Sequence, residues 1–204
     1  MRCSIRKAAT RSYAGNQSEN PTTRTRFPLA DDSRMAALLT GEAAGLPSIN
    51  VFRALANAPS LAPDYMQYFA HLFKPLELDA QIERLLVLLT GRLSGCEYVW
   101  RQNVVVAKSL GISDEKIAEL RKGNLDACCF SGAQKAAFKF AKETVEIIEV
   151  TEATHVEAEK HFSSRALAGI LYVVGSYMFL CRFVRTGGIP LDERPAEVPH
   201  GFFG

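Results

Sequence analysis

The 204-residue chain lacks several features that would assign it to a familiar class of protein. It has no Cys-x-x-Cys motif, and its five cysteines are odd in number and irregularly spaced, which argues against a disulfide framework. Its four histidines do not lie at zinc-ligand spacing from a cysteine pair, so we expect no metal site. No uninterrupted apolar run reaches the roughly 18 residues of a membrane-spanning helix, so we expect no membrane span. These absences favour a globular protein in a reducing compartment.

Acidic residues are missing from the first 18 positions, which hold four basic residues and several Ser and Thr. This composition is typical of a mitochondrial transit peptide, and a disordered basic tail on a cytoplasmic protein is the alternative. Residues 1–26 contain six basic residues and one acidic residue; removing them from the totals of 24 and 22 leaves residues 27–204 with a net charge of −3. This mildly acidic body argues against nucleic-acid binding.

Strand signals are also absent, because no segment alternates strictly between apolar and polar residues and neither Asn-Gly nor Asp-Gly occurs. The predicted fold class is therefore all-α. We place a tail at 1–30, a helical domain at 31–195 and a second tail at 196–204. Within the domain, Gly, Pro and capping residues predict helices over 34–44, 48–57, 62–74, 79–94, 96–110, 113–122, 131–148, 151–162 and 163–186.

Two of these helices are strongly apolar. The helix over 79–94 begins at Asp79, a plausible N-cap. Its apolar residues recur at the spacing of one helical face, namely Ile82, Leu85, Leu86, Leu89 and Leu93. The helix over 163–186 is apolar nearly all round, which predicts a place in the core or at a subunit interface.

The residues around the end of the first apolar helix carry a recognisable pattern. A Glu-Arg pair at 83–84 begins an apolar stretch that leads into Cys-Glu-Tyr-Val-Trp at 96–100, and a Gly-Ile-Ser-Asp-Glu turn follows at 111–115. This order resembles the carboxymuconolactone decarboxylase/AhpD-like alkylhydroperoxidase family, and residues 179–193 resemble its C-terminal helix and exit. The resemblance implies an all-helical homo-oligomer, a trimer or hexamer, with its active site near Cys96. Family activities include decarboxylation of a carboxylated lactone and thiol-dependent reduction of peroxides.

The chain departs from the family pattern at three positions. The second cysteine of the peroxide-reducing members falls at Val99, and their histidine falls at Asn103. Their glutamate falls at Arg84, with Glu83 beside it in swapped order. A disulfide relay needs two thiols in close contact, so a Cys-x-x-Cys peroxidase mechanism is disfavoured. A sulfenic acid formed on Cys96 would need a different resolving thiol.

Cys128 and Cys129 are candidates for that thiol, although nothing in the sequence brings either near Cys96. Three functions therefore stay open. The first is a cofactor-free lyase, decarboxylase or isomerase that acts on a small cyclic carboxylated or polyketide-type substrate. The second is a thiol peroxidase that uses Cys96 with an external reductant. The third is an inactive family member that serves as a binding or assembly partner.

A lyase needs a cation to hold the substrate carboxylate, an acid to protonate the resulting carbanion, and a dry pocket. The catalytic candidates are Cys96, Glu97, His71 and Glu83. The substrate-binding candidates are Arg84, Tyr98, Trp100 and Asn103, with Arg92 as a second cation. The Asn103 amide can donate to an oxyanion but cannot shuttle protons near neutral pH. We expect no cofactor.

Overall fold

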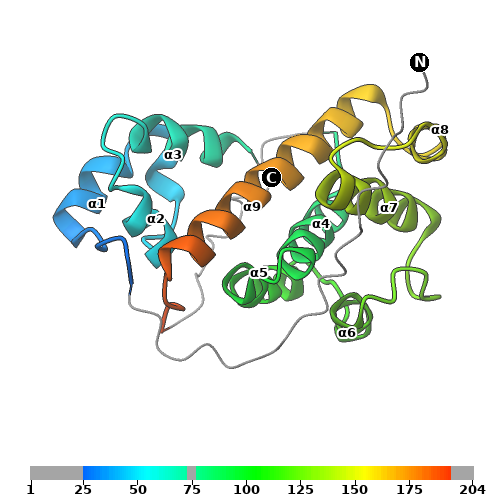
Figure 1. Ribbon diagram of the computed structural model, residues 1–204, viewed down its shortest axis with the longest axis horizontal. Coiled ribbons are helices and arrows are strands. Elements are labelled where there is room, and N and C mark those ends of the chain that lie inside the picture. The colour runs from blue at the N-terminus through cyan, green and yellow to red at the C-terminus, as the bar shows by residue number, and fades with distance from the viewer. Residues whose placement is uncertain (1–24, 73–76, 194–204) are drawn as a thin grey trace, which may run out of the picture.

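A computed structural model describes residues 25–72 and 77–193 (Figure 1). The transit-peptide prediction for residues 1–18 and the tail predicted at 196–204 lie outside the described residues. The described part contains helices and no strands, which confirms the all-α class. Its elements are α1 (Asp32–Leu38), the 3₁₀ helix η1 (Gly41–Gly45), α2 (Asn50–Leu55), α3 (Ala62–His71), α4 (Ala80–Leu93), α5 (Glu97–Ser109), α6 (Asp114–Lys122), α7 (Gly132–Ile147), α8 (Glu152–Glu159) and α9 (Ser164–Gly187).

Most of the predicted helices match an observed helix to within a few residues. The exception is the helix predicted over 34–44, which is divided into α1 and η1. Gly41 has a φ of +55° at this break, a conformation that glycine adopts without strain. Asp79 is the N-cap of α4, as predicted, and its carboxylate accepts from the backbone N–H groups of Gln81 and Ile82, both at 3.0 Å.

The α4 helix forms the centre of the domain and packs against α5, α7 and α9 (Figure 1). Its side chains are buried on every face, and the five residues from Leu85 to Leu89 have no exposed surface. A helix that is surrounded in this way must bury its polar residues as well. Glu83 and Arg84 are consequently held inside the domain, 7% and 1% exposed.

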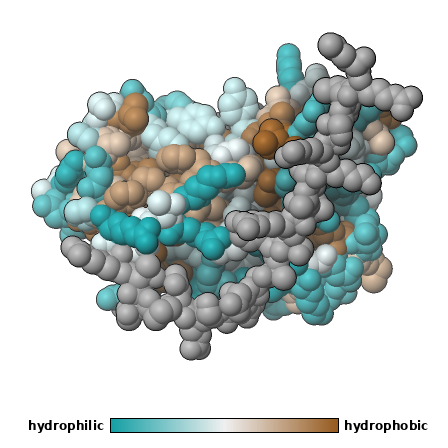
Figure 2. Space-filling view, viewed as in Figure 1, coloured by the Kyte–Doolittle hydropathy of each residue, from teal (hydrophilic) through white to brown (hydrophobic). Residues whose placement is uncertain are grey.

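The long α9 helix has a buried face and an apolar outer face. Its length and composition would allow it to cross a membrane, contrary to the expectation drawn from uninterrupted apolar runs. More than half of its most apolar window is nevertheless buried inside the domain. On the outer face, Leu171, Tyr172 and Phe179 are exposed, and Figure 2 shows hydrophobic surface over α3 and the neighbouring part of α9. The buried face confirms a core role, while the predicted homo-oligomer stays a prediction.

Candidate active site

Cys96 lies where α4, α5 and α9 meet. The chain leaves α4, turns through Gly95 with a φ of +60°, and enters α5 with Cys96 as the N-cap. The Cys96 backbone N–H donates to the Gly91 carbonyl at 2.8 Å, which fixes the turn. The Cys96 side chain is 2% exposed, although its neighbours Gly95 and Glu97 are exposed. The predicted nucleophile is thus a buried residue directly beneath the surface.

A second thiol, Cys181, lies beside Cys96 on α9. The neighbouring Cys181 thiol, as a hydrogen-bond donor, is the first cause of the lowered pKa of Cys96. Burial opposes that shift, while backbone N–H groups at the start of α5 and the charge of Arg185 support it. The pKa of Cys181 is strongly raised, first by the same hydrogen bond and then by burial. Cys96 is therefore the thiol of the pair that ionises more readily, and Cys181 keeps its proton.

Arg185 secures the same junction one turn after Cys181. Its Nη1 donates to the Ser94 carbonyl at 2.7 Å, which attaches the last turns of α9 to the α4–α5 turn. A Cβ added at Gly95 would lie 3.2 Å from Arg185 Nη1, closer than most side chains tolerate. Glycine at this position therefore provides both the left-handed turn and the room for the guanidinium.

A buried polar network lies beside the thiol pair on α4, α5 and α9. Arg84 Nη1 donates to Asn103 Oδ1 at 2.5 Å, and Asn103 Nδ2 donates to the Val99 carbonyl at 2.8 Å. Arg84 also hydrogen-bonds the Tyr177 hydroxyl, whose pKa burial nevertheless raises to about 12. Asn103 and Arg84, predicted to bind substrate, thus hold each other. Both remain candidates, but each is already occupied in a structural contact.

Glu83 is the titratable group of this network. Its carboxylate oxygen Oε1 lies 4.0 Å from Arg84 Nη2. Burial raises the pKa of Glu83 to about 7, and the nearby Arg84 charge only partly offsets that effect. A carboxyl group with this pKa can exchange a proton near neutral pH.

Tyr98 and a partner near the C-terminus join α5 to α2. The Tyr98 hydroxyl donates to an Asp192 carboxylate oxygen and accepts from the Val51 backbone N–H at 3.2 Å. The same carboxylate accepts from Gln102 Nε2 at 2.7 Å and from the Asn50 backbone N–H at 2.8 Å. Burial raises the pKa of Tyr98, and the bond to Asp192 raises it further. The Tyr98 hydroxyl thus has a structural role, while its predicted substrate contact stays a prediction.

The geometry also argues against roles for three other predicted residues. Burial raises the pKa of Glu97, but hydrogen bonds from Arg121 and Arg101 outweigh it and lower the pKa overall, which makes Glu97 a poor general acid. The Arg121 guanidinium lies 4.8 Å from the Trp100 ring centroid, so Trp100 packs beneath a surface cation. His71 is half exposed at the end of α3, with Nε2 at 3.8 Å from Glu42.

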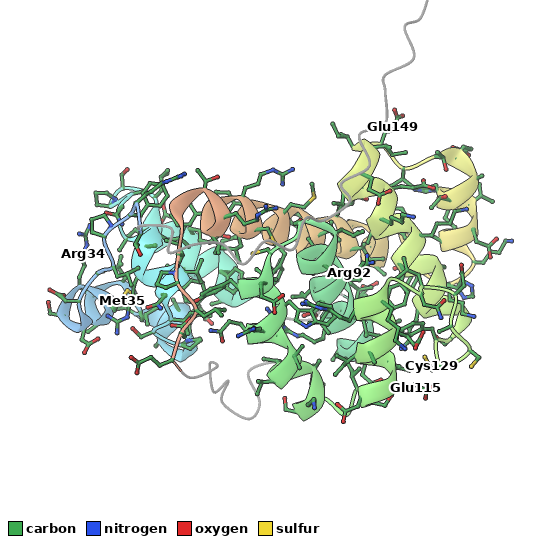
Figure 3. All side chains as sticks on the ribbon, turned by 60° about the horizontal axis from the view of Figure 1, so that its bottom comes forward. Arg34, Met35, Arg92, Glu115, Cys129 and Glu149 are labelled. Atoms are coloured by element: carbon green, nitrogen blue, oxygen red, sulfur yellow. The ribbon has the colours of Figure 1, made fainter. Side chains whose placement is uncertain are left out.

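Arg92, the second cation considered for substrate, caps α6 instead. Its Nε and Nη2 donate to the carbonyls of Arg121 and Lys122, at 2.9 and 3.2 Å. These carbonyls have no partner within their own helix, so they need one from outside it. Figure 3 labels Arg92 on α4.

The thiols proposed to resolve Cys96 lie in the connection between α6 and α7. Cys128 is exposed and Cys129 half-buried. Figure 3 shows Cys129 beside Glu115, at the end of the molecule opposite Arg34 and Met35. Desolvation and the charge of Glu115 raise the pKa of Cys129, which disfavours its thiolate.

Sequence reasoning missed Cys181, Tyr177 and Asp192. Cys181 follows Tyr177 by four residues, so helical spacing places both on one face of α9. That spacing could have predicted that Cys181 points inward, but no local signal pairs it with a residue 85 positions earlier. Among the described residues, no group of His, Cys, Asp and Glu could hold a metal ion.

The arrangement of helices around α4 is an AhpD-like fold. Residues 59–143, which include Cys96, match the model of the carboxymuconolactone decarboxylase family. No curated protein matches the chain closely enough to count as a relative.

Two solved structures resemble the whole domain. One is the AhpD core of an uncharacterized peroxidase-related protein from Ralstonia eutropha JMP134, with a TM-score of 0.69 and 19% identity over 87% of this chain and 94% of that one. The other is a cysteine-to-alanine variant of the debrominase Bmp8 in complex with 2,3,4-tribromopyrrole, with a TM-score of 0.68 and 17% identity over 85% and 95% of the two chains. At these identities the likeness is one of fold.

Proposed function

We propose that the protein is a thiol-dependent enzyme that reduces small hydroperoxides through Cys96. The observation that carries the proposal is the position of Cys96 at the start of α5 beside the buried Cys181 thiol, which lowers the pKa of Cys96. The thiolate is the form that attacks a peroxide. The AhpD-like fold and the family match at 59–143 support the same class of chemistry.

In the reaction, the Cys96 sulfur attacks one peroxide oxygen and the O–O bond breaks. The sulfur becomes a sulfenic acid, and the other oxygen leaves as an alcohol, or as water from hydrogen peroxide, after it takes up a proton. An external dithiol supplies the electrons that return Cys96 to the thiol. Because only 2% of Cys96 is exposed, we expect hydrogen peroxide to react faster than bulky lipid hydroperoxides.

The test is peroxide consumption by the full chain in the presence of a dithiol. Cys96→Ser should lower the rate about 100-fold or more, since serine cannot replace a thiolate nucleophile. Cys128→Ser, which removes an exposed thiol, is the matched control and should keep the wild-type rate. Equal rates in wild type and Cys96→Ser would refute the proposal.

A decarboxylase or isomerase remains the second candidate because of Glu83. This buried carboxyl has its pKa raised to about 7 and lies beside the Arg84 cation, which is the acid–cation combination that such a reaction needs. Here Cys96 would be dispensable and Glu83 essential. Turnover of a carboxylated cyclic substrate that survives Cys96→Ser and is lost in Glu83→Gln would support this function instead.

A further inference from the structure

In this chain, the residue at the position of the family's second cysteine cannot form a disulfide. Val99 occupies this position, is 3% exposed, and packs against α4, where its Cγ1 would lie 3.0 Å from a Cβ added at Gly91. The space beside Cys96 on this side is therefore filled by an inert side chain. Any second thiol has to approach from another direction.

That other direction is α9. Cys181 lies on the inner face of α9, has no exposed surface, and lies beside Cys96 and Ser94. Arg185, one turn further along α9, is bonded to the Ser94 carbonyl, so the two segments are held together at the level of both cysteines. We propose that Cys181 is the resolving thiol of Cys96, and that the two close a reversible disulfide between the start of α5 and the inner face of α9.

The step follows from the proposed function, on which it rests. After Cys96 becomes a sulfenic acid, the Cys181 sulfur attacks the Cys96 sulfur. The S–S bond forms, the S–O bond breaks, and the hydroxyl leaves as water with the proton of Cys181. One hydroperoxide is thereby reduced by two electrons, and two thiols are oxidised to one disulfide. A dithiol reductant then attacks the disulfide and restores both thiols.

The charges on the two cysteines determine the order of these reaction steps. While Cys96 is a thiolate, its hydrogen bond and charge keep the proton on Cys181. Oxidation converts Cys96 to a neutral sulfenic acid and removes that charge, so the Cys181 proton can leave. Cys181 therefore becomes a competent nucleophile only after Cys96 has reacted.

A disulfide requires the two sulfurs to approach to about 2.05 Å, so one of the two segments has to move. Cys96 precedes the first turn of α5 and follows Gly95, so it can shift more readily than Cys181, which lies within a long helix. Since its neighbours Gly95 and Glu97 are exposed, Cys96 is also the sulfur that the dithiol attacks first.

The test is to map the disulfide in the full chain. Wild-type protein is treated with one equivalent of hydrogen peroxide, blocked with a maleimide under denaturing conditions, and analysed by peptide mass spectrometry without reduction. We expect a linked peptide pair that contains Cys96 and Cys181. A stable Cys96 sulfenic acid, or a disulfide from Cys96 to Cys128 or Cys129, would overturn the inference and leave the proposed function standing.

Variants provide a second measurement. In Cys181→Ala the Cys96 sulfenic acid should accumulate and react with dimedone, and turnover with a dithiol should fall about tenfold. Cys181→Val, which leaves no cavity, should behave in the same way if the variant remains folded by circular dichroism. Cys128→Ser is the control and should keep the linked pair. Wild-type turnover in a folded Cys181 variant would overturn the inference.

If peroxide leaves Cys96 untouched, the proposed function fails and the pair is tested alone. Diamide, an oxidant that joins neighbouring thiols, should then still produce the Cys96–Cys181 disulfide. Its absence after diamide treatment would show that the two thiols cannot bond, and would overturn the inference independently of any peroxide reaction.

Discussion

The molecule holds two pairs of cysteines in opposite settings. Cys96 and Cys181 are 85 residues apart in sequence, buried, and side by side at a junction of helices. Cys128 and Cys129 are adjacent in sequence and lie toward the surface in a loop. The buried pair has one thiol with a lowered pKa, whereas the pKa of Cys129 is raised.

The contrast shows that reactivity depends on what surrounds a thiol more than on its exposure. At Cys96, a thiol donor, a helix N-terminus and the Arg185 charge outweigh the cost of burial. At Cys129, desolvation raises the pKa first and the charge of Glu115 raises it further, and the pKa stays raised overall. Bulky reagents should therefore react faster with the loop pair, Cys128 and Cys129, and small oxidants should react faster with Cys96.

The largest expected effect is a reversal of selectivity between two reagents. A bulky maleimide should modify Cys128 roughly 100-fold faster than Cys96, because Cys96 must first be uncovered by local opening. Hydrogen peroxide should oxidise Cys96 faster than Cys129, because the pKa of Cys96 is lowered and that of Cys129 is raised, which gives Cys96 the larger thiolate population. Mass spectrometry of each cysteine over a time course measures both orders. If both reagents favour the same cysteine, the comparison is wrong.

The second prediction concerns the pH dependence of stability that Glu83, beside the buried thiol pair, should produce. Folding raises the pKa of Glu83 from 4.5 to about 7, so the native state binds its proton more tightly than the unfolded state does. Below pH 4.5 this proton contributes its full stabilisation of about 3 kcal/mol. That contribution is lost as the pH rises through about 7. In Glu83→Gln the free energy of unfolding should therefore stay higher than that of wild type above pH 7.

Denaturant unfolding at pH 5 and pH 8 measures this difference, with Glu115→Gln as the control. Glu115 is exposed beside the loop cysteines, so this substitution should leave the wild-type pH dependence unchanged. A Glu83→Gln variant that loses stability between the two pH values as steeply as wild type would show that the buried carboxyl is not the titrating group.

The sequence predicts the helices well because their signals are local. Asp79 caps α4 and the regular apolar spacing of that helix defines its span, so both ends follow from a few neighbouring residues. The Cys-Glu-Tyr-Val-Trp segment likewise places Cys96 at the start of α5 from local pattern alone.

The site was harder to predict because its contacts join distant segments. Cys181 approaches Cys96 from α9, and Asp192 reaches back to Tyr98 on α5. The sequence reasoning therefore left Tyr98 free to bind substrate and sought a resolving thiol in Cys128 or Cys129. The partners of Glu97 and Arg92 were unpredictable for the same reason, since Arg121 and Lys122 belong to another helix.

The smallest effect concerns the loop end of the molecule and tests whether the two regions are independent. Arg92 bonds the last carbonyls of α6, directly before the segment that carries Cys128 and Cys129. Arg92→Ala should lower the free energy of unfolding by about 1 kcal/mol and speed maleimide labelling of Cys128. The rate of Cys96 oxidation should not change, because Arg92 takes no part in the lowered pKa of Cys96.

Gly123→Ala reaches the same contact by another route. Gly123 has a φ of +84°, and an added Cβ would lie 2.1 Å from Arg92 Nη2, so alanine both strains the backbone and displaces the guanidinium. It should destabilise the protein at least as much as Arg92→Ala, while Arg92→Lys, which keeps the charge without the planar fork, should fall between Arg92→Ala and wild type. If either substitution at this contact slowed Cys96 oxidation severalfold, the two thiol regions would be coupled through α4. The reactivity of each cysteine pair would then not depend on its own surroundings alone.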